Sequence, residues 1–309
     1  MQNVISKKPR SSRPILDSDR VFDIVNTTII TILTILFIYP LIYVVSCSFS
    51  GGQEIWSGQV LLFPKGFTTK GYQMAFENPD IWTGYLNSII YSVVGTVISV
   101  SLSLMTAFPL SRKEFPARNV IMFLYVFCLY FSGGMIPTYL VVKSVGFINT
   151  IWALVIPGAV SAWNVIIIRT YYLNNIPDEL YEAAEIDGYS KAGYFFKIVI
   201  PLSTPIIAVM VLFTAVGFWN SYFSAMLYLV ERSKFPLQLI LREILVVIKL
   251  GRFSEGMDTA GLSNYHEIIQ TAANLKYAVI VLASFPVMVM YPFVQKYFVQ
   301  GIMIGAIKS

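Results

Sequence analysis

Few side chains in this 309-residue chain could take part in covalent chemistry. It has a single histidine, His266, and two cysteines, Cys47 and Cys128, which both lie inside apolar runs. One histidine cannot build a multi-histidine metal site, and the two cysteines support neither a disulfide framework nor a zinc cluster. The sequence also lacks the G-x-x-x-x-G-K-[ST] pattern of a P-loop, which is the loop that cradles ATP phosphates. We therefore expect no catalytic residue, no metal and no cofactor in this chain.

Aromatic and amide side chains offer the remaining chemistry, which is non-covalent. Trp219, Asn220 and Phe223 are spaced so that they would share one face of a helix. Aromatic rings can cover the apolar faces of pyranose rings and an amide can bond to hydroxyls, so this group predicts a sugar path. The alternative is an aromatic belt at the membrane interface, with an amide that packs against another helix. Asn164 and Asn87 are further candidates for the same path.

Membrane-spanning helices must position these side chains, because the apolar residues gather into long runs. Only 13% of the residues are charged, which is about half of the usual share in soluble proteins. A helix needs roughly 20 apolar residues to cross a bilayer. The third run contains Ser132-Gly133-Gly134 and Pro137, so we expect it to end near Gly133 and to be followed by a short broken helix. We predict an all-α integral membrane protein with six transmembrane helices, at about residues 25–49, 85–110, 120–141, 151–168, 202–230 and 277–294.

The predicted spans contain no Asp, Glu, Lys, Arg or His. Proton pumps and voltage sensors keep ionisable side chains inside the membrane. The absence therefore argues against a proton-coupled transporter, a voltage sensor or an intramembrane protease, although sodium coupling through backbone carbonyls stays open. A substrate crossing here would be handled by hydroxyls, amides and aromatic rings, and its driving energy would come from another subunit.

Basic residues in the short loops orient the predicted spans. The polar tail of residues 1–24 contains five basic residues and the loop 111–119 contains three, whereas the segments 50–84 and 133–149 together contain three. We therefore predict cytoplasmic N- and C-termini, a six-span domain over residues 25–309, a cytoplasmic loop at 170–201 and an external loop at 231–276. The net charge of +5 has the same explanation and requires no nucleic-acid partner.

The predicted cytoplasmic loop has the residue types of two short helices joined by a turn. Pro177 with the acids after it suits a first helical turn, Gly188 suits a helix stop, and Ser190 suits a second helix start. Ala183 and Ala184 would let the backbone of another protein approach the first helix closely. The alternative is an amphipathic helix that rests on the bilayer surface.

The residues Glu182-Ala183-Ala184, Asp187-Gly188, Phe195, Ile198 and Pro201 follow one another at a distinctive spacing. In this order they resemble the EAA loop of binding-protein-dependent ABC permeases of the carbohydrate type, with Tyr189 in place of the commoner alanine. The long segment 237–276 looks like that of the LplC-type oligosaccharide permeases. Further stretches similar to the family are Asn87-Ser88, Leu110-Ser111-Arg112, Ile136-Pro137, Gly146-Phe147-Ile148-Asn149-Thr150, Trp219-Asn220 and Gln295-Lys296-Tyr297-Phe298.

The resemblance implies an importer in the cytoplasmic membrane of a bacterium. In that family two permease subunits form the pore, two ATPase subunits bind ATP and Mg and dock on the EAA loops, and an external binding protein delivers the substrate, here an oligosaccharide. The residues Glu182, Ala183, Ala184, Asp187, Gly188, Phe195 and Pro201 would then serve ATPase docking and coupling. The competing interpretation is a stand-alone carrier or channel for a neutral polar solute, which would not need such a loop.

Overall fold

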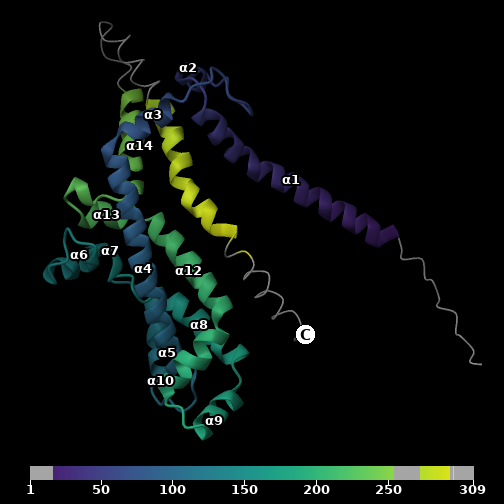
Figure 1. Ribbon diagram of the computed structural model, residues 1–309, viewed down its shortest axis with the longest axis vertical. Coiled ribbons are helices and arrows are strands. Elements are labelled where there is room, and N and C mark those ends of the chain that lie inside the picture. The colour runs from purple at the N-terminus through teal and green to yellow at the C-terminus, as the bar shows by residue number, and fades with distance from the viewer. Residues whose placement is uncertain (1–16, 254–271, 293–294, 296–309) are drawn as a thin grey trace, which may run out of the picture.

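The computed structural model describes residues 17–253, 272–292 and 295, and this part of the chain is helical without any strand. Figure 1 shows an elongated molecule with α9 at one end and α2, α3 and α14 at the other. A π-helical turn, Phe195–Val199, joins α10 to α11, and an unlabelled helix covers Ala272–Pro292. The numbered helices are α1 Asp17–Ser48, α2 Gly52–Trp56, α3 Lys70–Glu77, α4 Pro79–Ser111, α5 Arg118–Tyr130, α6 Met135–Ser144, α7 Trp152–Val155, α8 Ala162–Asn175, α9 Asp178–Ile186, α10 Lys191–Tyr194, α11 Ile200–Leu202, α12 Thr204–Trp219, α13 Phe223–Tyr228 and α14 Leu237–Phe253.

The 33-residue helix α4 runs through the centre of the molecule and packs against α12, α8 and α14. It begins well because Pro79 occupies its first turn and the Asn78 side chain accepts a hydrogen bond from the Asp80 amide at 2.9 Å. Its buried face is rich in small polar residues, which let neighbouring helices approach closely inside a membrane. These residues are Ser88, Ser92, Thr96, Ser99 and Ser103.

Helix α1 stands away from the rest of the molecule (Figure 1). Its apolar side chains are exposed on all sides, and only its last residues, Ser46 to Ser48, are buried. The helix begins at Asp17, so residues 17–24 belong to it and not to a separate polar tail as the sequence predicted. The physical reason is that a transmembrane helix continues beyond the apolar stretch, and hydropathy marks only the part that suits lipid.

Three helices are long and apolar enough to cross a membrane, namely 20–48, 79–111 and 272–292. Two further candidates are bent pairs, α5 with α6 at 117° and the 191–202 helix with α12 at 79°. The bend after α5 confirms the prediction that the third span ends near Gly133 and is followed by a short helix. The described residues therefore contain three to five crossing segments by length and composition, compared with the six that the apolar runs predicted.

The fourth and fifth apolar runs are not single helices, and here the prediction was wrong. The run 151–168 breaks after α7, where Pro157 and Gly158 lie, and restarts at α8, which continues to Asn175. The Ser161 side chain caps α8 by accepting from the Asn164 amide at 3.4 Å. The run 202–230 breaks between α12 and α13. A long apolar run reports burial in lipid, whereas Pro, Gly and capping residues decide whether its backbone is continuous.

The described residues of the segment that the sequence marked as a loop, 231–253 and 272–276, are largely helical. The segment contains α14, and the last described helix begins at Ala272, five residues before the predicted span. His266 lies outside the described residues, as do the rest of the stretch 254–271 and the C-terminal stretch 296–309.

Candidate coupling loop and substrate path

The loop between α8 and α12 folds as two capped helices, as its sequence predicts. Pro177 precedes α9, and Asp178 and Glu179 occupy its first turn. Gly188 adopts a left-handed φ of +80°. Its amide donates to the Glu185 carbonyl at 3.1 Å, and the Tyr189 amide donates to the Ala184 carbonyl at 2.9 Å, which is the Schellman pattern of a helix stop. The Ser190 Oγ accepts from the Gly193 amide at 3.1 Å and so caps α10.

Helix α9 has one face against the protein and one face open. Ala184 is 3% exposed and packs in the core beside Tyr194, so the expectation that both alanines face outward is wrong for this residue. Ala184 follows the half-buried Tyr181 by three positions, which places both on the inner face. Ile186 is 87% exposed and places an apolar side chain on the outer face. The remaining exposed residues of α9's last two turns are Leu180, Glu182, Ala183 and Glu185.

The other predicted coupling residues divide in the same way. Asp187 and Gly188 are exposed at the end of α9, and Pro201 is exposed in α11. Phe195 is buried, with its ring centroid 5.0 Å from that of Phe108 on α4. Glu182, Ala183, Asp187 and Gly188 thus form an open surface, while Ala184 and Phe195 hold that surface to the core.

Arg112 fastens the loop to the end of α4, a role that the sequence did not reveal. Its guanidinium lies over the rings of Tyr181, Tyr194 and Phe108, with the central carbon 4.7, 5.1 and 5.6 Å from the ring centroids. It also donates to the Tyr194 hydroxyl at 2.8 Å and pairs with Asp178 at 3.2 Å. The side chain is only 12% exposed. An arginine at the end of an apolar run with aromatic residues nearby was the signal that could have indicated this role.

The Asp178 carboxylate at the start of α9 accepts from two cations. The hydrogen bond from Lys113 at 2.9 Å lowers the pKa of Asp178 most, and the charge of Arg112 adds to this. Lys113 is 73% exposed and Asp178 is 58% exposed, so water screens this second pair strongly. We call Phe108, Arg112, Asp178, Tyr181 and Tyr194 the Arg112 cluster.

The predicted substrate-path residues around the end of α12 do not share a helix face, which corrects the prediction. The helix ends at Trp219, so Asn220 and Phe223 lie in and after the break. Trp219 is 6% exposed, its indole N–H donates to the Ala283 carbonyl at 2.9 Å, and its ring meets Tyr85 edge-on at 5.5 Å. Asn220 and Phe223 are exposed. Of the three, only the last two have side chains free to meet a solute.

The other two candidates for the substrate path, Asn87 and Asn164, form hydrogen bonds within this protein. Asn87 on α4 donates to the main-chain carbonyls of Ser233 at 2.8 Å and Phe235 at 3.1 Å, so both amide hydrogens are used. The Asn164 amide points to the Thr214 hydroxyl on α12 at 3.5 Å. Asn87 is therefore a packing amide, which is the alternative that the sequence left open.

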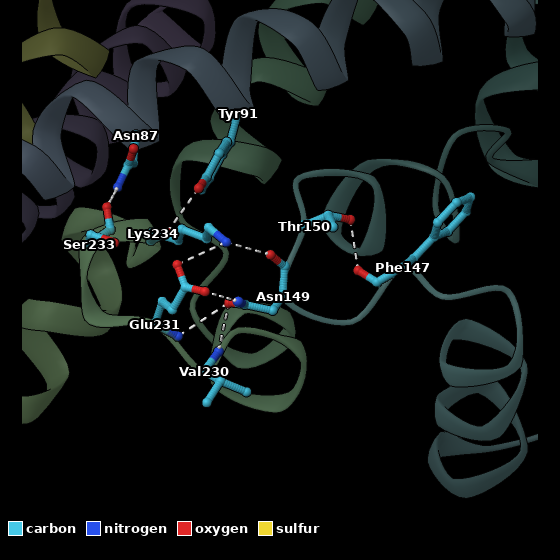
Figure 2. A network of polar contacts seen from close by, with 9 residues as sticks. All are labelled: Asn87, Tyr91, Phe147, Asn149, Thr150, Val230, Glu231, Ser233 and Lys234. Atoms are coloured by element: carbon cyan, nitrogen blue, oxygen red, sulfur yellow. Dashed lines mark hydrogen bonds and ion pairs between the residues drawn. The ribbon is translucent and has the colours of Figure 1, made fainter.

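Asn87 belongs to a polar cluster that joins α4 to the segments around Asn149 and Glu231, consisting of Asn87, Tyr91, Asn149, Glu231, Ser233 and Lys234 (Figure 2). Asn149 has φ +62°, a conformation that asparagine tolerates better than most residues. Its side-chain oxygen accepts from the Val230 and Glu231 amides, both at 3.2 Å, and its amide group donates to the Glu231 carboxylate at 2.6 Å. Lys234, 2.9 Å away, lowers the pKa of Glu231 most, followed by Asn149. The sequence indicated the motif Gly146–Thr150 that contains Asn149, but it did not predict that Asn149 would hold the segment around Glu231.

An apolar groove of about 620 Å³ lies between α4, α12 and the last helix. Trp219 borders it, whereas Asn87, Asn164, Asn220 and Phe223 do not. The predicted path residues are therefore not brought together in this groove. Within those residues no group of three or more His, Cys, Asp or Glu side chains could hold a metal ion.

Apolar helices long enough to cross a membrane, breaks within several apolar runs and an exposed acidic helix at one end are the features of a helical transport permease. Non-helical backbone inside a bilayer is tolerated where it meets protein or a watery cavity, as in transporters. The family model described as "Binding-protein-dependent transport system inner membrane component" matches residues 81–304. The chain belongs to this family.

Its relatives include carbohydrate transporters. It is 40% identical over 291 residues to the polygalacturonan/rhamnogalacturonan transport system permease protein YtcP of Bacillus subtilis (strain 168), covering 94% of this chain and 99% of the relative. It is 39% identical to Protein LplC of the same organism, covering 94% and 96%. A chain from the crystal structure of a bacterial ABC transporter involved in the import of the acidic polysaccharide alginate superposes with a TM-score of 0.80 at 32% identity, covering 92% of this chain and 98% of that chain. The protein is accordingly a permease subunit of an ABC importer, not a stand-alone carrier or channel.

Proposed function

We propose that this chain forms half of the translocation path for an oligosaccharide and that the outer face of α9 docks into a separate ATPase subunit. The observation that carries the docking proposal is the geometry of α9. It begins after Pro177 with two acidic residues in its first turn, ends in the turn at Gly188, and is exposed on one face and held to the core on the other. A helix that only rested on lipid would present a broad apolar face, whereas the exposed surface of α9 mixes Leu180 and Ile186 with Glu182 and Glu185.

The proposed topology has six crossing segments and places both termini in the cytoplasm of a bacterium. The segments are α1, α4, α5 with α6, α7 with α8, α11 and α12 with α13, and the last helix. The basic residues near the α9 end support this orientation. The loop 170–201 is then cytoplasmic, and the segment 231–276 with the polar cluster is external.

The proposed partners are a second permease chain, two ATPase subunits and an external solute-binding protein. Helix α1 supports a second permease, because its apolar surface is unmatched within its own chain and needs lipid or protein around it. ATP and Mg belong to the ATPase subunits in this proposal, because the sequence has no P-loop. This chain contributes no catalytic residue and needs no cofactor of its own.

We propose further that the oligosaccharide carries uronic acid groups. Two similar proteins support this, since the names of one relative and one solved structure refer to polygalacturonan/rhamnogalacturonan and to an acidic polysaccharide. The apolar groove is lined by no basic side chain. An unpaired carboxylate is costly in such a setting, so the cations for it would come from the partner permease. Asn220 and Phe223 supply an amide and a ring from this chain.

The test is to purify the chain from its native host in mild detergent, identify the proteins that accompany it, and measure ATP hydrolysis in nanodiscs. We expect two ATPase subunits and a second permease, with hydrolysis stimulated by the binding protein together with oligogalacturonates. Neutral oligosaccharides of equal length form the matched comparison. Stimulation by neutral sugars alone would refute the uronic acid assignment, and purification without any ATPase subunit would refute the docking proposal.

A further inference from the structure

The two ends of α4 are each fastened to a segment that faces a different side of the molecule. At one end, Arg112 follows the last residue of α4 and holds α9 and α10 through Asp178, Tyr181 and Tyr194. The guanidinium is nearly buried, so its stacking and bonding are much less screened than those of an exposed ion pair. Ala184 of α9 also packs in the core, Lys113 forms an exposed ion pair with Asp178, and the short Ile176-Pro177 connection joins α9 to α8.

At the opposite end, α4 holds the segment between α13 and α14 through main-chain groups. Asn87 donates to two carbonyls of that segment, and the Tyr91 hydroxyl donates to the Lys234 carbonyl at 2.9 Å (Figure 2). The Ser88 hydroxyl accepts from the Leu237 amide at 2.9 Å. Because these bonds engage the backbone, they fix the path of the segment itself and not only the positions of its side chains.

The polar cluster extends this attachment to the short helices beside α4. Asn149 lies between α6 and α7, and its amide donates to the carbonyl of Tyr228 at the end of α13 at 2.8 Å. Its carbonyl accepts from Lys234 at 3.1 Å. Figure 1 shows α6, α7 and α13 together on one flank of α4. The residues 147–150, 228–235 and the first turns of α4 are therefore one connected unit.

Between these two attachments α4 is an unbroken helix, unlike the third, fourth and fifth apolar runs. From Asn87 to Arg112 there are 25 positions, which at 1.5 Å per residue is about 38 Å and enough to cross a bilayer. Pro109 removes one helical hydrogen bond near the end of α4. The turn after it is held instead by Arg169, whose Nε donates to the Leu110 carbonyl at 2.8 Å.

We propose that α4 acts as a rigid helix that transmits movement between α9 and the external polar cluster. Arg112 attaches it to α9, and Asn87 and Tyr91 attach it to the polar cluster. This rests on the proposed function, because it assumes that α9 receives movement from an ATPase subunit. Arg112 and Asn87 are positioning residues, since they act through α9 and through the segment 233–237. Loss of either attachment leaves docking and hydrolysis in place and disconnects them from the external side.

The variants are chosen to separate attachment from stability. Arg112→Lys keeps the charge and loses the planar stack and fork, so it is not a conservative change at this site. Lys113→Ala is its control, because it removes the exposed ion pair to the same Asp178. Asn87→Ala with Tyr91→Phe releases the carbonyls of Ser233, Lys234 and Phe235. Its control is Thr83→Ala, which removes an exposed hydroxyl that bonds only within α4.

The first readout is hydrogen exchange of the assembled complex in nanodiscs, with and without ATP and vanadate. In the wild type, we expect nucleotide to change the exchange of amides 232–237. Arg112→Lys should abolish that change while ATPase subunits stay bound, and Lys113→Ala should retain it. The proposal that α4 transmits movement is wrong if nucleotide leaves the hydrogen exchange of residues 232–237 unchanged in the wild type. It is also wrong if nucleotide changes their exchange equally in Arg112→Lys.

The second readout is stimulation of hydrolysis by binding protein and sugar. We expect Arg112→Lys and the Asn87/Tyr91 double variant each to lower stimulation by about fivefold, the low end of typical coupling between sites. Combining them should add little, because both interrupt one route. Fully multiplicative losses would overturn the proposal. A third outcome separates the two proposals. If no sugar stimulates hydrolysis, but nucleotide changes the exchange of residues 232–237 in the wild type and not in Arg112→Lys, the oligosaccharide assignment is wrong and the proposal for α4 is supported.

Discussion

At the scale of single residues, several polar side chains in the described part of the chain donate to main-chain carbonyls of other segments. Trp219, Asn87, Tyr91 and Arg169 each donate to such a carbonyl. Several of these carbonyls lie near helix ends or beside breaks, where no intrahelical partner is present. A free carbonyl is costly in an apolar environment, so these donors maintain the broken helices that a permease needs.

Trp219 and Asn220 should therefore respond differently to substitution. We expect Trp219→Ala to lower the free energy of unfolding by about 3–5 kcal/mol, because it removes a buried ring and leaves the Ala283 carbonyl without its donor. Asn220→Ala should leave stability unchanged and reduce sugar uptake, since its side chain is exposed at the break after α12. Thermal unfolding in detergent and uptake in cells measure the two effects. Normal uptake in Asn220→Ala would exclude it from the path.

Gly188 and Gly146 form a matched pair for testing the coupling loop. Both end a helix with a positive φ, +80° and +77°, and at each the place that a Cβ would occupy has no atom of another segment within 4 Å. Replacing either with Asp should cost a similar backbone strain, about 1–2 kcal/mol at most. Only Gly188→Asp should release the ATPase subunit, because the partner fills its open space. Equal amounts of bound ATPase in both variants would contradict the docking surface.

At the scale of elements, the sequence predicted where apolar helices and the loop lie, and it failed where backbone continuity matters. The stop at Gly188 and the cap at Ser190 were predictable because turn chemistry is local. The inward position of Ala184 and the ring stack around Arg112 were not, because they depend on contacts with α4 and α10, which are distant in sequence. Asn87 was misjudged for the same reason, since its partners follow it by about 146 positions.

The two alanines of α9 test which face of this helix meets a partner. Ala184→Trp should destabilise the permease itself by about 1–3 kcal/mol, because the larger ring is forced into a filled core. Ala183→Trp should leave the permease as stable as the wild type and prevent ATPase binding. Thermal unfolding of the isolated permease and pull-down of the ATPase subunit give the comparison. An unstable Ala183→Trp variant would mean that both alanines are structural.

The attachment of α9 should not depend on pH in the physiological range. Lys113 and Arg112 lower the pKa of Asp178 below its usual value of 3.8, so the carboxylate is charged whenever the pH is higher. A lowered pKa stabilises the folded form above the unfolded pKa, and this stabilisation is lost only as the pH falls through the lower folded value. We expect exchange protection factors of α9 to be constant from about pH 5 to 8. A transition near pH 6 would show that another group controls the attachment.

At the scale of the whole molecule, the chain has the features of one subunit of a larger complex. Helix α1 lies apart from its own body, α9 presents an exposed face at one end, and the polar cluster holds the segment between α13 and α14 to α4. The family and the solved alginate importer match this arrangement over most of the chain. In this account, ATP binding elsewhere shifts an inward–outward equilibrium, and the permease converts that shift into pore opening.

Cross-linking from α9 tests the central claim most directly. The exposed Cys128 would first be replaced by Ser, and a thiol-specific photo-crosslinker attached to Ala183→Cys or, as the matched control, to Ala184→Cys within the assembled complex. We predict an adduct with the ATPase subunit from position 183, which is exposed, and little or none from position 184, which is buried. Adducts with lipid alone from position 183 would mean that α9 rests on the membrane surface and that the coupling assignment is wrong.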